Sequence, residues 1–429
     1  MAEAPAKFDA IVIGAGPAGC SAAYYLASRG FKVVVIERGR TPGSKNVFGG
    51  RVYLAPLKEI YPDFEKSAPI HRWVTRERIS FLHGNDLISV DYEGNDRKSF
   101  TTYLSQLTAW MALKAESAGA YIINDVTITG LLKEGSRVVG VKAGDESVKA
   151  DVVIDAEGIN RLVLERSGIV QPLSPSNVAL GVKEVVKVNP DALANQFGLA
   201  EGEGMAWSLL GDVTGGIPGG GFIYTNKDSV SIGVVMLLDG AITGAREMVY
   251  RYVEGLKLHP KLIKYFKDSR IMEYSAHLIP ENVMSLMPPQ FAYDGLLIAG
   301  DAAGFLLNLG YTYRGVDFAS YSGYLAGKAV EQAHGLGGMS AENLSVYTRM
   351  LEQSFIMKNL KRFSGVSKLM RNRRLFTSYP AMIASLMRHM YSLDFDSQKI
   401  LTNLLSSAKE NGISIYSLIS DGIEVMSRL

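Results

Sequence analysis

The chain has 429 residues, 45 of them basic and 43 acidic, with a formal net charge of +2. This length predicts two or three domains, and the near balance of charge gives no support for nucleic-acid binding. The single cysteine, Cys20, excludes an intrachain disulfide, a Cys-x-x-Cys redox pair and an iron–sulfur site built by this chain alone.

The first predicted element is a buried strand at residues 8–13, which leads directly into a glycine turn at 14–19 and then a helix. In a Gly-x-Gly-x-x-Gly turn, the first glycine allows the tight turn, the second lets the backbone approach a pyrophosphate, and the third lets the helix pack on the strand. The anion then lies at the helix N-terminus, where N–H groups and the positive dipole end face it. A glycine-rich surface turn is the alternative. The dinucleotide-binding candidates here are Gly14, Gly16, Pro17, Ala18 and Gly19.

A second predicted strand, 32–36, ends at Glu37, at about the separation expected for a carboxylate that binds a ribose hydroxyl. This carboxylate argues against a 2′-phosphorylated nucleotide. The following segment, 44–51, carries paired cations and paired glycines, so we expect it to run alongside the cofactor and its phosphates; a solvated loop is the alternative. The candidates from these two segments are Glu37, Arg38, Lys45, Asn46, Gly49, Gly50 and Arg51.

Two later strands end in comparable turns. The strand 149–155 closes on an acidic-glycine turn, and the strand 295–299 closes on Gly-Asp. Because these turns are spread over most of the chain, they favour an extended FAD molecule over the nicotinamide cofactor of one compact Rossmann unit. We expect Asp301 to bind the ribityl hydroxyls and a helix beginning near Ala302 to point its positive end at the flavin ring; a simple helix cap is the alternative. The candidates are Glu157, Gly158, Gly300, Asp301 and Gly304.

The sequence lacks the motifs of several other enzyme classes. No second strand–Gly-x-Gly-x-x-Gly unit follows, which argues against a disulfide reductase or a quinone reductase with its own nicotinamide domain, so electrons would arrive from another protein. The six histidines have no ligand spacing, and we expect no metal site. No Gly-x-Ser-x-Gly elbow supports a serine hydrolase.

Strand patterns at 79–92, 179–186 and 229–235 predict a β-rich insertion on the substrate side. A glycine run at 215–221 opens another strand; close approach by a ligand or backbone and a hairpin turn are both consistent with it. The candidates in this strand are Gly219, Gly220, Gly221 and Tyr224. The predicted division is a discontinuous FAD-binding domain (1–70, 103–168 and 295–339), a β-rich domain (71–102 and 169–294) and a helical C-terminal region (340–429).

The C-terminal region contains basic residues at 371–374 followed by an apolar stripe with helical spacing. Basic flanks and an apolar face are typical of interfacial helices, but a subunit interface or a core-packing helix gives the same pattern. Pro380 would open or kink this helix. No apolar run is long enough to cross a bilayer, and the short polar segment 1–7 predicts neither a signal peptide nor an anchor. The stripe consists of Leu375, Phe376, Tyr379, Met382, Ile383, Leu386, Met387 and Met390.

Together these motifs resemble the FixC family of flavoprotein subunits in FixABCX electron-bifurcating complexes, which is similar to electron-transfer-flavoprotein:quinone oxidoreductases. The resemblance runs nearly end to end. It rests on residues 14–19, 45–47, 49–51, 219–226, 273–277, 299–304, 308–310 and 314–315.

The resemblance implies a glutathione-reductase-type FAD-binding domain with an inserted antiparallel β quinone domain. It also implies FixA/FixB-like electron-transfer flavoprotein α and β subunits that oxidise NADH, a ferredoxin-like FixX-type iron–sulfur subunit, and a membrane quinone as acceptor on the cytoplasmic face. The glycine-rich strand with Tyr224 would border the quinone. The residues implied to lie beside the flavin are Asn308, Leu309 and Gly310.

Two positions depart from the family pattern. Glu157 stands where aspartate is usual, and Leu104 occupies a place where many relatives have arginine, which puts one phosphate contact in doubt. Two other functions stay open on the same fold. The first is a prenyl reductase or flavin hydroxylase, and the second is a non-catalytic FAD-binding subunit that organises a complex.

Overall fold

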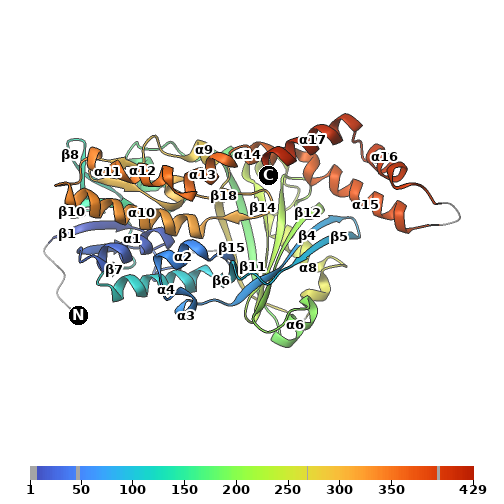
Figure 1. The fold of residues 1–429 in the computed structure, drawn as a ribbon, viewed down its shortest axis with the longest axis horizontal. Coiled ribbons are helices and arrows are strands. Elements are labelled where there is room, and N and C mark those ends of the chain that lie inside the picture. Colours follow the sequence, from blue (N-terminus) through green and yellow to red (C-terminus); the bar gives the residue numbers. More distant parts are fainter. Residues whose placement is uncertain (1–6, 45–48, 268, 394–396) are drawn as a thin grey trace.

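The computed structural model describes residues 7–44, 49–267, 269–393 and 397–429, so the candidates Lys45 and Asn46 lie outside the described part of the chain. Two sheets occupy the body of the molecule, and the last helices extend from one end of it (Figure 1). The predicted α/β fold class, with a β-rich insertion and a helical C-terminal region, is confirmed.

The first sheet runs, in spatial order, through β16 (Ala292–Tyr293), β17 (Leu296–Ile298), β10 (Glu146–Asp155), β1 (Phe8–Ile13), β2 (Val33–Ile36) and β7 (Tyr121–Ile123). β1 pairs in parallel with both β2 and β10, and β10 pairs in parallel with β17. The central strands have apolar buried runs (10–13, 33–36 and 152–154) because both faces of this parallel sheet are covered. Two further strands, β8 (Gly130–Glu134) and β9 (Arg137–Ala143), extend the edge of β10 as a hairpin.

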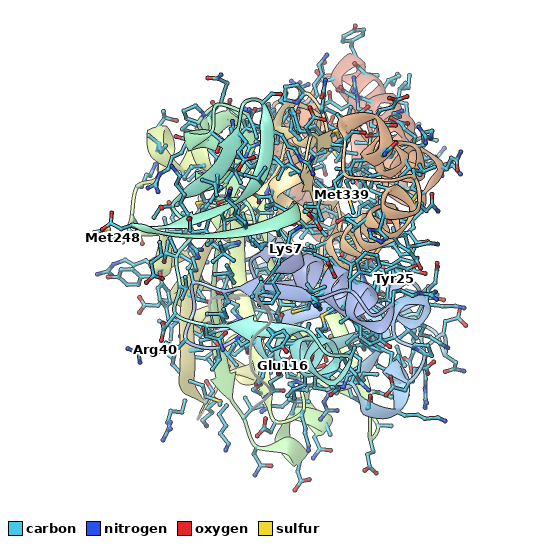
Figure 2. The ribbon with its side chains drawn as sticks, turned by 90° about the vertical axis from the view of Figure 1, so that its left-hand side faces the viewer. Lys7, Tyr25, Arg40, Glu116, Met248 and Met339 are labelled. Carbon is cyan, nitrogen blue, oxygen red and sulfur yellow. The ribbon has the colours of Figure 1, made fainter. Side chains whose placement is uncertain are left out.

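Three helices pack together beside this sheet: α1 (Pro17–Ser28), α4 (Leu104–Ser117) and α10 (Val316–Gly335). Tyr25 of α1 donates a hydrogen bond of 2.5 Å to Glu331 of α10, and Figure 2 shows Tyr25 where α1 packs against α10. This contact joins segments about three hundred positions apart, so the FAD-type domain is assembled from distant parts of the chain. The short helices of this half are α2 (Ala55–Ile60), α3 (Phe64–Ser67), α5 (Leu162–Arg166) and α9 (Val283–Leu286).

The second sheet runs through β15 (Arg270–Pro280), β11 (Val178–Lys187), β14 (Ser229–Leu237), β13 (Gly219–Thr225), β12 (Glu203–Gly211), β4 (Arg72–His83), β6 (Ser99–Tyr103) and β3 (Gly49–Tyr53), with β5 (Asp86–Glu93) paired to β4. Its neighbours are antiparallel except for the parallel pair β12–β4. The strands predicted at 179–186 and 229–235 are confirmed, whereas the segment 79–92 is a hairpin that contains the end of β4, a turn at 84–85 and most of β5. β3 pairs with β6 here, so the domain boundary predicted at residue 70 cuts across this sheet.

Short helices and turns connect and cover the second sheet. Trp207 of β12 is buried there, and its indole N–H donates a 2.8 Å hydrogen bond to the Ser80 hydroxyl of β4. These elements are α6 (Pro190–Phe197), α7 (Leu238–Gly244), α8 (Val249–Leu258) and the 3₁₀ turns η1 (Pro175–Asn177), η2 (Asp212–Thr214) and η3 (Ile263–Tyr265).

The C-terminal region is helical, as predicted. Its elements are α11 (Ala341–Leu344), α12 (Val346–Gln353), α13 (Phe355–Arg362), α14 (Val366–Leu369), η5 (Arg373–Phe376), α15 (Ser378–Tyr391), α16 (Ile400–Glu410) and α17 (Ile415–Arg428). No helix in the described ranges is long and apolar enough to cross a membrane.

The predicted apolar stripe spans η5 and α15 and is partly buried, since six of its eight residues are half-buried. Phe376 and Met382 are buried, and Met382 belongs to a small core with Ala408 and Ile413 of the two following segments. Pro380 lies in the first turn of α15, where its missing N–H has no intrahelical role, so it opens the helix without kinking it. Core packing therefore accounts for Phe376 and Met382, and the half-buried residues keep part of the stripe at the surface.

Candidate functional site

A large cleft lies between the carboxyl ends of the parallel strands and the second sheet. Its walls include the ends of β1, β2 and β10, the N-terminus of α10, and residues of β3, β13 and β15, and it encloses about 2120 Å³ with the open space at its mouth. Ligands of open parallel sheets bind at this edge, outside the carboxyl ends of the strands. The cleft therefore runs from the strand ends of the first sheet, where nucleotides bind in such folds, to a second part lined by the second sheet.

The three glycines of the turn have different structural roles. A Cβ on Gly19 would lie 1.9 Å from the Gly14 carbonyl oxygen, and Gly14 has φ +92° with the Ala156 carbonyl 2.7 Å from its Cβ position. Gly16, by contrast, has nothing within 4 Å of its Cβ position. Gly14 and Gly19 thus permit close packing, and Gly16 opens space in front of α1. The turn residues that line the cleft are Gly14, Gly16, Pro17 and Ala18.

Glu37 supports this turn from the end of β2. One of its carboxylate oxygens accepts the Ala15 N–H at 2.8 Å, and the other accepts the Gly39 N–H at 2.7 Å. The side chain is buried and lines the cleft together with Arg38. Glu37 therefore shapes the cleft wall and leaves acceptor lone pairs for a hydroxyl group, since each carboxylate oxygen accepts more than one hydrogen bond.

The acidic-glycine turn after β10 also lines the cleft through Glu157 and Gly158. The Glu157 carboxylate accepts the N–H groups of Val163 and Leu164 at 2.9 and 3.0 Å, so it caps the short helix α5. Burial raises the pKa of Glu157, while these hydrogen bonds oppose the change. Leu104, the other departure from the family pattern, lines the cleft at the start of α4.

The Gly300-Asp301 turn lines the cleft, but the α-helix predicted near Ala302 is wrong. The chain forms one 3₁₀ turn there, η4 (Gly300–Ala303), because it bends again through Gly304, which has φ +81°. The N-terminus that reaches the cleft belongs instead to α10, through Val316 and Asp317. Burial raises the pKa of Asp301 to about 6.

Arg51 of β3 places a positively charged side chain in the wall of the cleft. Its guanidinium pairs with Glu77 and donates to the Tyr53 hydroxyl at 2.9 Å. The buried Arg51 Nε has no hydrogen-bond partner among the described residues, although buried donors are normally paired. This donor is therefore available to a ligand. Gly50, which precedes it on β3, is not among the described residues that line the cleft.

Tyr224 lines the far part of the cleft, whereas the three glycines before it do not. A Cβ on Gly219 would lie 2.1 Å from the Val235 carbonyl oxygen, and one on Gly220 would lie 2.7 Å from the Leu209 carbonyl oxygen. The glycine run, which also includes Gly221, thus has a structural explanation in the close approach of neighbouring strands. Burial raises the pKa of Tyr224 to about 12, so its hydroxyl stays protonated at neutral pH.

The segment 308–310 lies behind the cleft wall. Asn308, in β18 (Leu307–Asn308), donates to Glu281 at 2.8 Å, and Gly310 lies against the C-terminal Leu429. Asn308, Leu309, Gly310 and Gly304 are absent from the lining.

The cleft also contains residues that the sequence analysis did not select. They include Lys183, whose pKa burial lowers, His277, whose pKa burial also lowers, and Tyr313 of β19 (Tyr313–Arg314). The 273–277 motif was the signal that could have led to His277. Nothing local marked Lys183 or Tyr313, because their role follows from the placement of the second sheet.

The fold and the cleft define a dinucleotide-binding α/β protein in which an extended cofactor can cross the parallel strands and reach a second sheet. Residues 9–52 and 49–329 match the family model described as FAD dependent oxidoreductase. The chain is 41% identical to the probable electron transfer flavoprotein-quinone oxidoreductase YdiS of Escherichia coli K12, over 97% of this chain and 98% of that protein. It is 35% identical to protein FixC of Bradyrhizobium diazoefficiens, over 90% and 91% of the two chains.

A geranylgeranyl bacteriochlorophyll reductase-like protein of Thermoplasma acidophilum superposes with a TM-score of 0.72, covering 98% of this chain and 99% of that one. At 18% identity, this similarity concerns the fold alone. The chain belongs to the FAD-dependent oxidoreductase family and, within it, to the group of FixC and electron-transfer-flavoprotein–quinone oxidoreductases.

The protein is accordingly an FAD-dependent oxidoreductase that transfers electrons, and the cleft fits its cofactor. The open space at Gly16 lies at the N-terminus of α1, which carries no side-chain cap, and the unpaired Arg51 Nε lies farther along the wall. When bound, FAD supplies the acceptance and release of electrons one or two at a time.

Proposed function

We propose that this protein takes electrons from an electron-transfer flavoprotein and reduces a quinone bound in the cleft. The observation that most supports this function is the continuation of the cleft beyond the glycine turn to a wall that contains Phe222, Tyr224 and Tyr313. Such side chains can pack against a planar ring, and the protonated Tyr224 hydroxyl can donate a hydrogen bond to a quinone oxygen. The name of the YdiS relative, a probable electron transfer flavoprotein-quinone oxidoreductase, agrees with this proposal.

In this proposal the candidates at the strand ends have defined tasks. The turn at 14–18 binds the pyrophosphate at the N-terminus of α1, and Glu37 accepts a ribose hydroxyl. Asp301 accepts from the ribityl chain, and the N-terminus of α10 faces the flavin ring. Gly19 acts through packing of α1 on β1.

We further propose that the protein works within an NADH-oxidising complex that reduces both ferredoxin and quinone. Its partners would be FixA/FixB-like α and β subunits of an electron-transfer flavoprotein and a FixX-like iron–sulfur subunit. Two sequence features support this: one Gly-x-Gly-x-x-Gly unit leaves no second dinucleotide fold for NADH, and the lone Cys20 cannot hold a cluster. Cys20 is also buried, and burial strongly raises the pKa of its thiol.

Peripheral binding to the cytoplasmic face of the membrane is part of the proposal. α16 and α17 carry a large exposed apolar surface, which includes Ile423 at 63% and Met426 at 86% exposure. Apolar surface of this kind enters the headgroup boundary of a bilayer. We call it the C-terminal apolar face; it consists of Ile400, Leu401, Leu405, Ile415, Tyr416, Ile419, Ile423 and Met426.

The test is anaerobic reduction of the flavin in the co-purified complex with NADH, followed by addition of a short-chain quinone. We expect the flavin absorbance to bleach and then to return as the quinone is reduced. Reoxidation by oxygen together with hydroxylation of an aromatic substrate would favour a hydroxylase, and saturation of a prenyl chain would favour a prenyl reductase. Flavin that stays oxidised throughout would favour a non-catalytic subunit and contradict the proposal.

A further inference from the structure

Glu281 is a buried carboxyl group that the proposed function does not yet use. It follows β15 directly, and the residue is 3% exposed. Its Oε1 accepts a hydrogen bond from Asn308 at 2.8 Å, and its Oε2 accepts one from the Tyr313 hydroxyl at 3.1 Å. Three segments that are separate in the sequence therefore meet at one carboxyl group.

The Glu281–Tyr313 hydrogen bond connects two cavities. Tyr313 lines the cofactor cleft. Glu281 and Asn308 line a second, much smaller pocket, whose accessible volume of about 10 Å³ leaves room for about one water molecule and whose wall also includes the exposed Ser364 of the C-terminal region. Glu281 does not line the cleft, and Tyr313 does not line the smaller cavity, so the hydrogen bond crosses the wall between them.

Both groups can accept and donate a proton. Burial raises the pKa of Glu281 to about 7, although the hydrogen bonds from Tyr313 and Asn308 and the charge of Arg371 oppose this rise. Glu281 therefore exchanges protons readily near neutral pH. Burial, with the charge and hydrogen bond of Glu281, raises the pKa of Tyr313 well above its usual value, so Tyr313 can relay a proton without resting as an anion.

Few other charged or titratable groups face this pair. Arg371 faces Glu281 and is itself held by Asp239 at 2.8 Å, and Tyr224 faces Tyr313 from β13. Among the neighbours of Tyr224, the charge of Arg51 lowers its pKa, and Tyr53 and Glu77 raise it. Glu281 and Tyr313 thus lie between the part of the cleft that would hold the quinone and the smaller pocket, which we call the outer cavity.

We propose that Glu281 and Tyr313 form a proton path from the outer cavity to the quinone in the cleft. This inference rests on the proposed function, because reduction of a quinone to a quinol consumes two electrons and two protons. The electrons come from reduced flavin. For each proton, the Tyr313 O–H bond breaks as an O–H bond forms on a quinone oxygen, the Tyr313 oxygen takes the proton of the Glu281 carboxyl, and the carboxylate takes a proton from solvent in the outer cavity. Two such cycles complete the quinol.

Asn308 is a positioning residue in this path. Its amide holds one carboxylate oxygen of Glu281, so the other oxygen stays directed at Tyr313. When Glu281 carries a proton, its O–H can donate to the Tyr313 oxygen, and the Tyr313 hydroxyl is then free to turn toward the cleft.

The experiment compares the wild type with Glu281→Gln, Tyr313→Phe and the exposed control Glu342→Gln, each loaded with FAD and fully reduced under anaerobic conditions. Stopped-flow absorbance follows reoxidation by a quinone and, separately, by a ferricenium salt, which accepts electrons without protons. We expect Glu281→Gln and Tyr313→Phe to slow the quinone reaction about 100-fold, which is typical of a lost proton donor. The ferricenium reaction and the control variant should keep the wild-type rate.

Two readouts separate proton transfer from a structural effect. Infrared spectra of the apoprotein should show a carboxyl group titrating near pH 7 that is absent in Glu281→Gln. Formic acid, which can occupy the space that Glu281→Ala opens, should restore quinone reduction in Glu281→Ala and leave Tyr313→Phe slow.

The outcomes distinguish the two proposals. Wild-type flavin that no quinone reoxidises overturns both the proposed function and the proton path. Wild-type flavin that reacts with quinone, together with an equally fast Glu281→Gln variant, overturns the proton path alone. Equal slowing with quinone and ferricenium would assign a merely structural role to Glu281 and would also overturn the path.

Discussion

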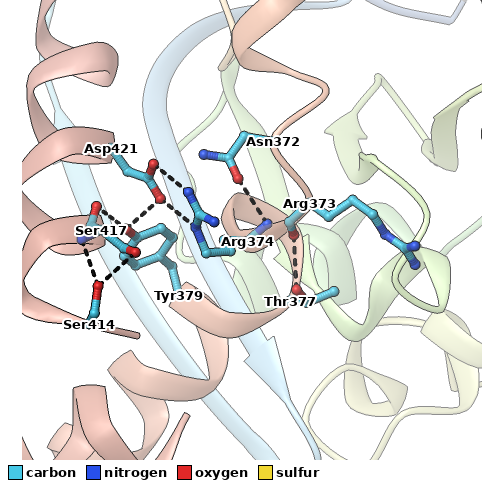
Figure 3. A network of polar contacts seen from close by, with 8 residues as sticks. All are labelled: Asn372, Arg373, Arg374, Thr377, Tyr379, Ser414, Ser417 and Asp421. Atoms are coloured by element: carbon cyan, nitrogen blue, oxygen red, sulfur yellow. Dashed lines mark hydrogen bonds and ion pairs between the residues drawn. The ribbon is translucent and has the colours of Figure 1, made fainter. Parts of the chain in front are cut away.

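Arg374 donates two parallel hydrogen bonds to Asp421, from Nε and Nη2 at 2.7 Å each, and so joins η5 to α17 (Figure 3). Tyr379 adds a third bond to the same carboxylate at 2.8 Å. The Asp421 side chain is 5% exposed, although the helix around it is otherwise largely on the surface. Paired, charge-assisted hydrogen bonds of this geometry are among the stronger polar contacts in proteins. They hold the helix that carries much of the C-terminal apolar face.

Asp421→Asn should loosen α17. A hydrogen bond to a charged group contributes about 1.5–3 kcal/mol, so we expect a comparable loss in local stability and faster hydrogen exchange across α16 and α17. Hydrogen bonding from Arg374 holds the pKa of Asp421 below its usual value, so the pair stabilises the fold above about pH 4 and is lost as the pH falls further. Arg373→Ala is the control, because Arg373 makes a longer 3.3 Å bond to the Gly216 carbonyl. Unchanged exchange in Asp421→Asn would contradict this role.

Gly19→Ala should impair folding, whereas Gly16→Ala should impair FAD binding. The new methyl group at Gly19 would collide with the Gly14 carbonyl, so we expect poor folding even without cofactor. The methyl group at Gly16 meets no protein atom, so the apoprotein should keep its melting temperature but bind FAD at least about 10-fold more weakly. Thermal unfolding of the apoprotein and FAD titration would check both expectations. Normal FAD affinity in Gly16→Ala would show that the pyrophosphate lies elsewhere.

Glu37→Gln should weaken FAD binding by about 10- to 100-fold, since an amide cannot accept from Ala15 and Gly39 with both of its polar atoms. Fluorescence titration of the apoprotein with FAD measures the change. The exposed Glu201 offers a matched glutamate-to-glutamine control. Equal affinities for the two variants would argue against a role of Glu37 in the site.

Glu281 makes the stability of the fold depend on pH. Its folded pKa of about 7 lies above its ordinary value of 4.5, so its contribution is complete below pH 4.5 and is lost as the pH rises through 7. We expect Glu281→Gln to gain stability over the wild type between about pH 5 and pH 8, by up to roughly 3 kcal/mol. Melting temperatures of the two apoproteins across this range provide the measurement. Parallel curves would mean that Glu281 is not the titrating group.

The C-terminal apolar face should bind lipid. Replacing Ile419 and Ile423 by aspartate removes two exposed apolar side chains from α17, so co-sedimentation with phospholipid vesicles should fall at least about 10-fold. Leu113→Asp on α4 changes an equally exposed apolar residue far along the chain and should have no effect. Undiminished sedimentation of the double variant would place membrane contact elsewhere, and subunit co-purification would then test a protein interface.

Much of the cofactor domain could be predicted from local pattern. The run 8–13, the glycines that follow and Glu37 specify a strand, a turn and an acidic residue after the next strand, and each lies where those patterns indicate. The helix expected near Ala302 failed because Gly304 ends the first turn there. The glycine run before Tyr224 indicated a close approach, and only the neighbouring strands show that protein backbone makes it.

The sequence by itself therefore determined the glycine turn at 14–19, the parallel strands and the FAD family, because hydrophobic periodicity and glycine geometry act over a few residues. The tertiary structure decided which side chains share the cleft, that α10 supplies the second helix N-terminus, and that Glu281 meets Asn308 and Tyr313. These contacts join residues that are distant in the chain. They depend on how the two sheets pack, and packing of this kind has no local periodicity in the sequence.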